Sequence, residues 1–232
     1  MFAILSTKTP HHVFFENKIF KKFNNLVTIY ETKLIKPKFS TKVKFEIKRD
    51  NYEKKIFFKG KSFRFLSKAY KVRDINDHQT NNILKKNKIK YILVFGTKKI
   101  NSNILKNYKN RIYNLHGGDP QEYRGLDSHY WSIYHGNFKL HSCLHKLNNK
   151  LDDGKIIYIN KLLIKKNLKI FQLRKINTIN CIKMTLKLFE KLSDKKKIKL
   201  LRQKKIGGYY SFMPSELKKI VEKKFNNRNK FL

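Results

Sequence analysis

Apolar runs alternate with polar segments along the chain in a pattern that predicts strands between helices. Residues 2–6 and 91–95 are short and mainly apolar, as expected for strands buried on both faces of a sheet. Four further strands are predicted, at residues 26–35, 111–115, 139–146 and 155–163. Helices are predicted after Thr9-Pro10 and at residues 80–88, 104–110, 128–134 and 170–192. This order is typical of an α/β fold.

Two regions are less regular. Residues 36–72 are rich in lysine and alternate polar with aromatic positions, which predicts strands or an irregular insert. Residues 193–232 are basic, and residues 207–214 are their one structured-looking element. We therefore expect a main domain over residues 1–192 and a short basic C-terminal extension over residues 193–232. A chain of 232 residues is long enough for one substantial core.

The charge is strongly positive. With 55 basic and 16 acidic residues, the formal net charge is +39, which suggests a nucleic acid or an anionic membrane as partner. Residues 112–160, however, contain five basic and five acidic residues, so the excess charge lies outside them. Only eight of the 55 basic residues are arginine, the residue that bidentate phosphate recognition favours. The pattern therefore disfavours a dedicated nucleic-acid role, although the charge would attract a small anionic substrate.

Membrane and export signals are absent from the sequence pattern. The chain has no run of 18 apolar residues, and the first predicted strand lacks a basic leader and a cleavage site. The two cysteines, Cys143 and Cys181, do not make a disulfide framework. These observations predict a cytoplasmic protein without membrane insertion.

Three polar motifs between residues 114 and 154 are the most informative feature. They are Asn114-Leu115-His116-Gly117-Gly118, Tyr123-Arg124-Gly125 and Leu151-Asp152-Asp153-Gly154. An amide, an imidazole and a carboxylate suit the transfer of an acyl group to an amine. The Asn114 amide can donate to an oxyanion, and His116 can accept the amine proton. Asp152 can orient the imidazole and stabilise its cationic form.

The motifs resemble those of folate-dependent formyltransferases, which contain Asn-x-His, Tyr-Arg-Gly and Leu-Asp-x-Gly elements in the same order. The resemblance is densest over residues 91–160. It implies a Rossmann-like formyltransferase domain with a mixed, mostly parallel central sheet over residues 1–192. It also implies that Asn114, His116 and Asp152 are catalytic, with N10-formyltetrahydrofolate as co-substrate. Its site is expected near the loops after Gly96 and around Asp152.

Within this family, residues 114–131 look most like the short sugar-nucleotide N-formyltransferases. The Tyr-Tyr-Ser-Phe-Met-Pro element at 209–214 and the pair His11-His12 agree with that group. The implied acceptor is a nucleoside-diphosphate-linked amino-dideoxy sugar, favoured as the 4-amino-4,6-dideoxy type, on the way to a surface polysaccharide such as O-antigen. A homodimer is a further possibility. The candidate binding residues are Gly96, Gly117, Gly118, Tyr123, Arg124, Gly125, Asp127, His129, His11 and His12.

Other functions stay open at this point. Phosphoribosylglycinamide formyltransferase of purine synthesis has a similar length, but it has a glycine-containing phosphate loop after its first strand. Residues 6–12 of this chain contain no glycine. Methionyl-tRNA formyltransferase would match the basic charge, but its appended β-barrel does not fit comfortably into the residues after Leu163. A non-catalytic folate- or nucleotide-binding relative is the remaining alternative.

Each candidate also has a purely structural interpretation. An isolated Asn-x-His at a strand end is usually a turn, and residues 152–154 are also expected to form a hairpin turn. For Arg124 we favour pairing with a neighbouring acid over contact with substrate. His141, Cys143 and His145 would share one face of a strand, but their spacing of roughly 7 Å is too wide for three ligands of one metal ion. No metal is therefore expected.

Overall fold

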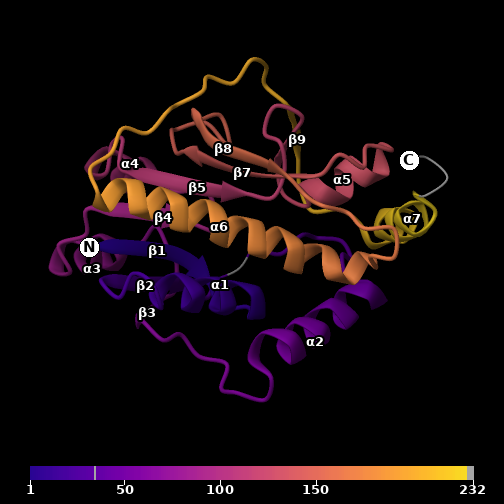
Figure 1. Cartoon of the computed structure of the whole chain (residues 1–232), viewed down its shortest axis with the longest axis horizontal. Helices are drawn as coiled ribbons and strands as arrows, with labels where there is room; N and C mark the ends of the chain where they lie inside the picture. Colours follow the sequence, from indigo (N-terminus) through magenta and orange to yellow (C-terminus); the bar gives the residue numbers. More distant parts are fainter. Residues whose placement is uncertain (34, 229–232) are drawn as a thin grey trace.

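The computed structural model describes residues 1–33 and 35–228 as one α/β arrangement (Figure 1). Leu34, in the predicted strand 26–35, and residues 229–232, in the predicted extension, lie outside the described residues. The strands are β1 (Phe2–Thr7), β2 (Leu26–Glu31), β3 (Lys68–Val72), β4 (Tyr91–Val94), β5 (Ile112–His116), β6 (Tyr123–Gly125), β7 (His141–Lys146), β8 (Ile156–Lys161) and β9 (Gly208–Tyr210). The helices are α1 (Pro10–Phe20), α2 (Lys44–Phe58), α3 (His78–Lys86), α4 (Ser102–Asn107), α5 (Ser128–Tyr134), the short 3-10 helix η1 (Ile170–Gln172), α6 (Leu173–Ser193) and α7 (Ser215–Asn226).

The central sheet has the strand order β3-β2-β1-β4-β5-β7-β8. Its first five strands are parallel, and β7 is antiparallel to both β5 and β8. The predicted mixed, mostly parallel and Rossmann-like sheet is therefore confirmed. The carboxyl ends of β1, β4 and β5 lie at one edge of the sheet, the edge at which open α/β folds bind ligands.

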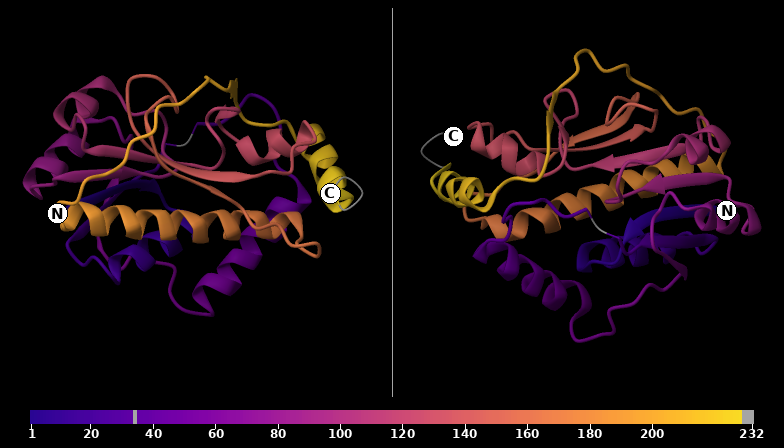
Figure 2. Two further views of the ribbon diagram at one scale, coloured as in Figure 1. Left: turned by 45° about the horizontal axis from the view of Figure 1, so that its top comes forward. Right: turned by 180° about the vertical axis from the view of Figure 1, so that it is seen from behind.

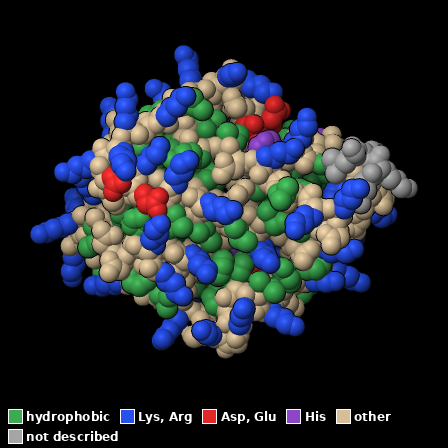
Figure 3. Space-filling model, viewed as in Figure 1, with side chains coloured by type: hydrophobic (Ala, Val, Ile, Leu, Met, Phe, Trp, Pro, Cys, Tyr) green, Lys and Arg blue, Asp and Glu red, His purple; other side chains and the backbone are tan. Residues whose placement is uncertain are grey.

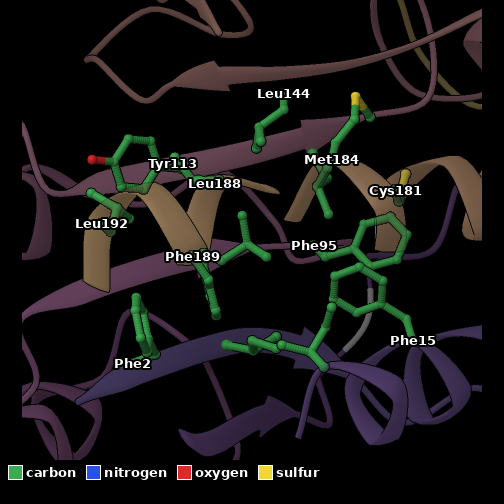
Figure 4. Close-up of a cluster of buried hydrophobic side chains, with 14 of the residues drawn as sticks. Phe2, Phe15, Phe95, Tyr113, Leu144, Cys181, Met184, Leu188, Phe189 and Leu192 are labelled. Carbon is green, nitrogen blue, oxygen red and sulfur yellow. The ribbon is translucent and has the colours of Figure 1, made fainter. Parts of the chain in front are cut away.

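Successive side chains along each buried strand point to opposite faces of the sheet, and both faces are apolar. In β1, Phe2 and Ile4 join the core beneath α1 and α6, while Ala3 and Leu5 join the core beneath α3 and α4. Figure 4 shows the first of these cores, where side chains of α6 point at the sheet and the rings of Phe2 and Phe189 stack at 4.0 Å. The long helix α6 crosses the front of the sheet in Figure 1. Burial on both faces explains why these strands are continuous apolar runs.

The prediction for residues 36–72 was wrong in one respect, because residues 44–58 form helix α2 rather than strands or an irregular insert. The helix is held by contacts from distant parts of the chain. Glu53 is fully buried, and its carboxylate accepts a hydrogen bond of 2.9 Å from Arg174 Nε in α6. The ring of Phe57 stacks on Phe14 of α1 at 4.0 Å. Such tertiary contacts decide the conformation of a segment whose local pattern is weak.

The segment after Ser193 returns along the other side of the molecule. In Figures 1 and 2 it runs from the end of α6 past β8 to β9 and then into α7 beside α5. Strand β9 pairs in parallel with β6 as a separate two-stranded sheet. Met213, Val221 and Phe225 are buried in a third apolar cluster together with residues of α5. The predicted division between residues 192 and 193 remains a prediction.

The positive charge is widely spread. Figure 3 shows lysine and arginine side chains over the whole visible face, with acidic side chains at only a few places. Within the part of the chain that the structure describes, no helix is long and apolar enough to cross a bilayer.

Candidate active site

Strand β5 presents the first motif. Tyr113 and Leu115 point into the core beneath α6, so Asn114 and His116 project from the opposite face of the strand. His116 is buried, whereas Asn114 is half-buried. The antiparallel register with β7 sets Asn114 opposite His145, which is fully buried.

The turn between β7 and β8 brings Asp152 onto these side chains. Asp152 Oδ1 accepts a hydrogen bond of 3.1 Å from Asn114 Nδ2 and lies 3.4 Å from His145 Nε2. Its other oxygen, Oδ2, accepts a hydrogen bond of 2.9 Å from the backbone N–H of Gly125 and lies 3.5 Å from His116 Nδ1. The structure thus brings Asn114, His116 and Asp152 together from two segments of the chain, with His145 as a fourth member.

These contacts determine the ionisation of Asp152. Burial by itself would raise the pKa of this carboxyl. The neighbouring His116 and His145 and the hydrogen bond from Gly125 outweigh that effect, so the pKa of Asp152 lies well below its ordinary value. The residue is therefore a carboxylate throughout the neutral range.

Hydrogen bonds to backbone carbonyls show which ring nitrogen of His116 and of His145 carries a hydrogen. His116 Nε2 lies 2.7 Å from the carbonyl oxygen of Tyr123, and a carbonyl only accepts, so Nε2 carries a hydrogen. His145 Nδ1 likewise donates to the carbonyl of Lys146 at 2.8 Å. In the neutral ring Nε2 then accepts from Asn114 Nδ2 at 3.2 Å, whereas in the protonated ring, the form that lowers the pKa of Asp152, Nε2 faces Asp152 Oδ1 at 3.4 Å. In neutral His116, the free nitrogen is consequently Nδ1, which faces Asp152.

The Tyr123–Gly125 motif forms β6 and holds the Asp152 turn. Arg124 donates to the carbonyls of Gly207 at 2.7 Å and Leu151 at 3.4 Å, so it bridges the C-terminal segment and the turn. The prediction that Arg124 pairs with a neighbouring acid was therefore wrong, because the hydrogen-bond partners of Arg124 are backbone carbonyls. Gly125 has a φ of +91°, and a Cβ there would meet the Tyr210 carbonyl oxygen at 2.1 Å.

We expect Gly125→Ala to destabilise the protein by more than about 1 kcal/mol, because the alanine adds both backbone strain and a clash. Gly136→Ala is a matched control, since Gly136 has a φ of +79° and a Cβ added there would meet no atom within 4 Å. Urea unfolding of both variants measures the difference. Equal losses of unfolding free energy would show that the contact with Tyr210 contributes nothing.

Gly117 and Gly118, the two glycines of the first motif, lie beside His116. A Cβ on Gly118 would approach Ser128 Cβ at 2.8 Å and His116 Nε2 at 3.0 Å, so the close approach requires glycine. Gly117 lies next to His129. His129 Nε2 donates to the carbonyl of His141 at 2.6 Å, and burial lowers its pKa to about 4.

The remaining candidates make no hydrogen bond or ion pair with Asp152 in the described structure. Asp127 precedes α5 and accepts from the backbone N–H of Met213 at 2.9 Å, which anchors the C-terminal segment. His11 and His12 stack on each other at 3.8 Å at the end of β1, and burial lowers the pKa of His12 to about 3. Gly96, with a φ of +78°, allows His12 to approach, because a Cβ would lie 2.3 Å from its Nε2. The pairing of Leu5 with Val94 and of Val94 with Asn114 places His11, His12 and Gly96 at the same carboxyl edge of the sheet as His116.

Two cavities flank this group of residues. One, of about 180 Å³, is lined by Gly118, Asp119, Glu122, Tyr123, Ser128, His129, Ser132, Asn137, Lys139, Leu140 and His141. It therefore shares Tyr123 and Ser128 with the surroundings of His116. The other, of about 320 Å³, is lined by Lys99, Ile100, Asn101, Ser102, Leu105 and Asn149. Asn149 belongs to the same turn as Asp152.

Two residues of the site were not predicted as such. The sequence singled out His145 only as part of a rejected metal site, together with His141 and Cys143. Within residues 1–33 and 35–228, no group of three or more His, Cys, Asp or Glu side chains is arranged to hold a metal ion. No motif includes Gln203, although its Nε2 donates to the carbonyls of Asp152 at 2.8 Å and Gly154 at 2.9 Å. Both residues depend on spatial neighbours that local sequence does not reveal.

Comparison with known proteins identifies the family. The formyl transferase family model matches residues 20–177, about two thirds of the chain. The chain belongs to this family.

Relatives in this family include larger proteins. The bifunctional polymyxin resistance protein ArnA of Wigglesworthia glossinidia brevipalpis is 29% identical over an alignment of 157 residues, and the match covers 57% of this chain and 24% of that protein. The chain thus spans about a quarter of the length of this relative.

Solved structures share the fold. The formyltransferase PseJ of Anoxybacillus kamchatkensis, solved with a UDP-linked formamido sugar and tetrahydrofolate, matches with a TM-score of 0.59 at 17% identity. The match covers 90% of this chain and 85% of that one. A 4-N formyltransferase of Francisella tularensis matches with a TM-score of 0.61 at 14% identity over 90% of this chain and 76% of its own. At such identities, the likeness establishes the α/β formyltransferase fold.

Proposed function

We propose that this protein is an N-formyltransferase. It transfers the formyl group of N10-formyltetrahydrofolate to the amino group of a nucleoside-diphosphate-linked amino-dideoxy sugar, with the 4-amino-4,6-dideoxy type favoured. The observation that carries the proposal is the convergence of Asn114, His116 and Asp152 in a chain of the formyl transferase family.

The proposed roles follow from charge development in the reaction. When the neutral amine attacks the formyl carbon, the formyl oxygen gains negative charge and the amine nitrogen gains positive charge. Neutral His116 offers Nδ1 as the base that takes the amine proton. The imidazolium so formed would donate from Nε2 to the Tyr123 carbonyl and from Nδ1 towards Asp152 Oδ2, which lies 3.5 Å away. As the bond between the formyl carbon and N10 breaks, this proton would pass to N10 of the departing tetrahydrofolate. The Asp152 carboxylate would hold the ring in place while it carries the proton.

Asn114 is the proposed oxyanion donor. Its Nδ2 group donates to Asp152 at 3.1 Å and to His145 at 3.2 Å. Both amide hydrogens are thus used in this arrangement, so donation to the substrate oxygen requires one of the two contacts to be exchanged. Removal of an oxyanion donor costs about 3 kcal/mol of transition-state stabilisation in enzymes of known mechanism.

The two cavities support separate places for the two substrates. The cavity of about 320 Å³ combines apolar Ile100 and Leu105 with polar Asn101, Ser102 and Asn149, a lining that suits the flat, polar-edged ring system of a folate. The cavity of about 180 Å³ beside His116 contains Asp119 and Glu122. Their carboxylates would attract an amino sugar, whose amine is cationic before it loses its proton.

The proposed acceptor is a sugar nucleotide rather than glycinamide ribonucleotide. The segment after β1 contains no glycine, and its side chains are engaged with one another. Thr7 Oγ1 and Thr9 Oγ1 each lie 2.8 Å from His12 Nδ1, and Ser6 Oγ donates to the Phe95 carbonyl. This favours a structural role over a phosphate-binding one. The fold shared with PseJ, whose structure holds a UDP-linked sugar, agrees with the choice.

The setting of the reaction is part of the proposal. Folate and nucleotide sugars are cytoplasmic metabolites, so we place the enzyme in the cytoplasm, in a route to a surface polysaccharide such as O-antigen. The spread of positive charge would accelerate the encounter with the anionic nucleotide sugar. A homodimer is the proposed solution state.

A mass-spectrometric assay tests the function directly. The purified protein is incubated with N10-formyltetrahydrofolate and, in separate reactions, with dTDP- or GDP-linked 4-amino-4,6-dideoxy sugars, their 3-amino isomers and glycinamide ribonucleotide. We expect formylation of an amino sugar and none of glycinamide ribonucleotide. Formylation of glycinamide ribonucleotide alone would replace the proposed acceptor, and formylation of no amine in the panel would contradict the proposal.

A further inference from the structure

The backbone of Asp152 adopts a conformation that needs support. Its φ is +50°, in the left-handed region, which a residue with a side chain adopts less readily than glycine does. The turn is also tightly closed, because a Cβ on Gly154 would lie 1.6 Å from the Lys146 carbonyl oxygen. Contacts from outside the turn must therefore select this conformation.

The C-terminal segment supplies the contact. Gln203 Nε2 donates to two carbonyls of the turn, those of Asp152 and Gly154, at 2.8 and 2.9 Å. One amide group thus bridges two carbonyls on either side of Asp153. The hydrogen bond from Gly125 N–H then holds the Asp152 carboxylate itself at 2.9 Å.

Gln203 is itself anchored on both sides. Two residues before it, Leu201 exchanges two backbone hydrogen bonds of 2.8 Å with Ile156 at the start of β8. One residue after it, the N–H of Lys204 donates to Gln121 Oε1 at 2.8 Å. The position of Gln203 is therefore set by segments next to the second and third motifs.

We propose that Gln203 is a positioning residue, whose amide donors fix the turn that aims the Asp152 carboxylate at His116. This inference rests on the proposed function. Gln203 lies outside residues 20–177, the part that matches the family model. The chain thus completes its catalytic turn with a side chain from its own C-terminal segment.

A feature of Gln203 argues against a role in packing alone. Its Oε1 is buried and has no hydrogen-bond partner among the described residues. A buried oxygen without a hydrogen-bond partner is destabilising, and an apolar side chain of the same shape would avoid that cost. The donors of the amide, rather than the volume of the side chain, explain the glutamine.

Two substitutions separate the donors from the shape. Gln203→Met keeps the length of the side chain but donates nothing, and Gln203→Lys restores a donor without the unpartnered oxygen. Gln172→Met is the matched control, because it removes the amide of a glutamine that bonds the Lys169 N–H and the Tyr52 hydroxyl rather than the Asp152 turn. For each protein we would measure kcat, KM for both substrates, Tm and the titration of the Asp152 carboxyl by carboxyl-carbon NMR.

We expect Q203M to lower kcat by on the order of 10- to 100-fold, the effect of a small misplacement of a catalytic group, with KM nearly unchanged. Q203K and Q172M should remain close to the wild type. The Asp152 carboxyl, which faces His116, His145, Asn114 and the Gly125 N–H, should titrate at a higher pH in Q203M than in the wild type.

A Q203M protein with wild-type kcat and an unchanged Asp152 titration would overturn the inference, as would an equal loss of kcat in Q172M. If the wild-type protein formylated no acceptor, the proposed function would fail. The NMR titration would still decide whether Gln203 positions the Asp152 carboxylate.

Discussion

His116→Asn should lower kcat for formyl transfer by on the order of 10²–10⁴-fold, the usual contribution of a positioned acid or base. Asparagine retains an amide near the place of Nδ1, but it cannot take up the proton of the attacking amine. It also loses the 2.7 Å hydrogen bond from Nε2 to the Tyr123 carbonyl. Steady-state kinetics with the acceptor found in the mass-spectrometric assay would measure the effect.

The matched control is His78→Asn, since His78 lies at the start of α3, away from the site. We expect this control to keep wild-type kcat. The Tm of His78→Asn should stay close to that of the wild type, whereas His116→Asn removes part of a buried ring and its hydrogen bond to Tyr123, so Tm is measured beside kcat. A His116→Asn enzyme with near-normal kcat would remove His116 from the proposed mechanism.

Asp152→Asn should also lower kcat by on the order of 10²–10⁴-fold, because the amide cannot stabilise protonated His116. The neighbouring Asp153→Asn is its control. Asp153 lies in the same turn, and its carboxylate accepts a long hydrogen bond of 3.4 Å from Asn148. We expect Asp153→Asn to be fully active. Equal activity of the two variants would contradict the role of Asp152.

The same variant should reveal a pH-dependent contribution to stability. The pKa of Asp152 is lower in the folded protein than in the unfolded chain, where an Asp titrates near about 3.9. The folded state therefore binds fewer protons, so the contribution is fully present above about pH 4 and is lost as the pH falls towards the folded pKa. Urea unfolding should show a gap of about 1–3 kcal/mol between wild type and Asp152→Asn at pH 7. The gap should narrow below about pH 4. A constant gap would show that ionisation of Asp152 does not stabilise the fold.

The fold was predictable where local pattern and tertiary structure agree. Strands such as residues 91–94 are buried on both faces, and their apolar runs identify them. Helix α2 was missed because its stability comes from the buried pair Glu53–Arg174 and the stacked rings of Phe14 and Phe57. These partners lie far away in the sequence, and no pattern inside the helix indicates them.

The residues of the site also divide into those that short motifs indicate and those that only the folded structure brings into place. Asn114, His116 and Asp152 belong to short motifs whose order and residue types indicate acyl transfer. His145 faces Asn114 only because β7 runs antiparallel to β5 in one register, which the sequence alone leaves undetermined. Gln203 follows Asp152 by 51 residues in the sequence. The basic composition of its segment does not indicate that the segment returns to the Asp152 turn.

The C-terminal segment, which returns to β6 and to the Asp152 turn, is synthesised after the strands of the central sheet. A chain leaves the ribosome from its N-terminus, so β5, β7 and β8 can pair before residues 201–210 emerge. Until those residues arrive, β6 lacks its partner strand and the Asp152 turn lacks its Gln203 clamp. The nascent protein thus acquires its sheet first and its complete reaction centre last.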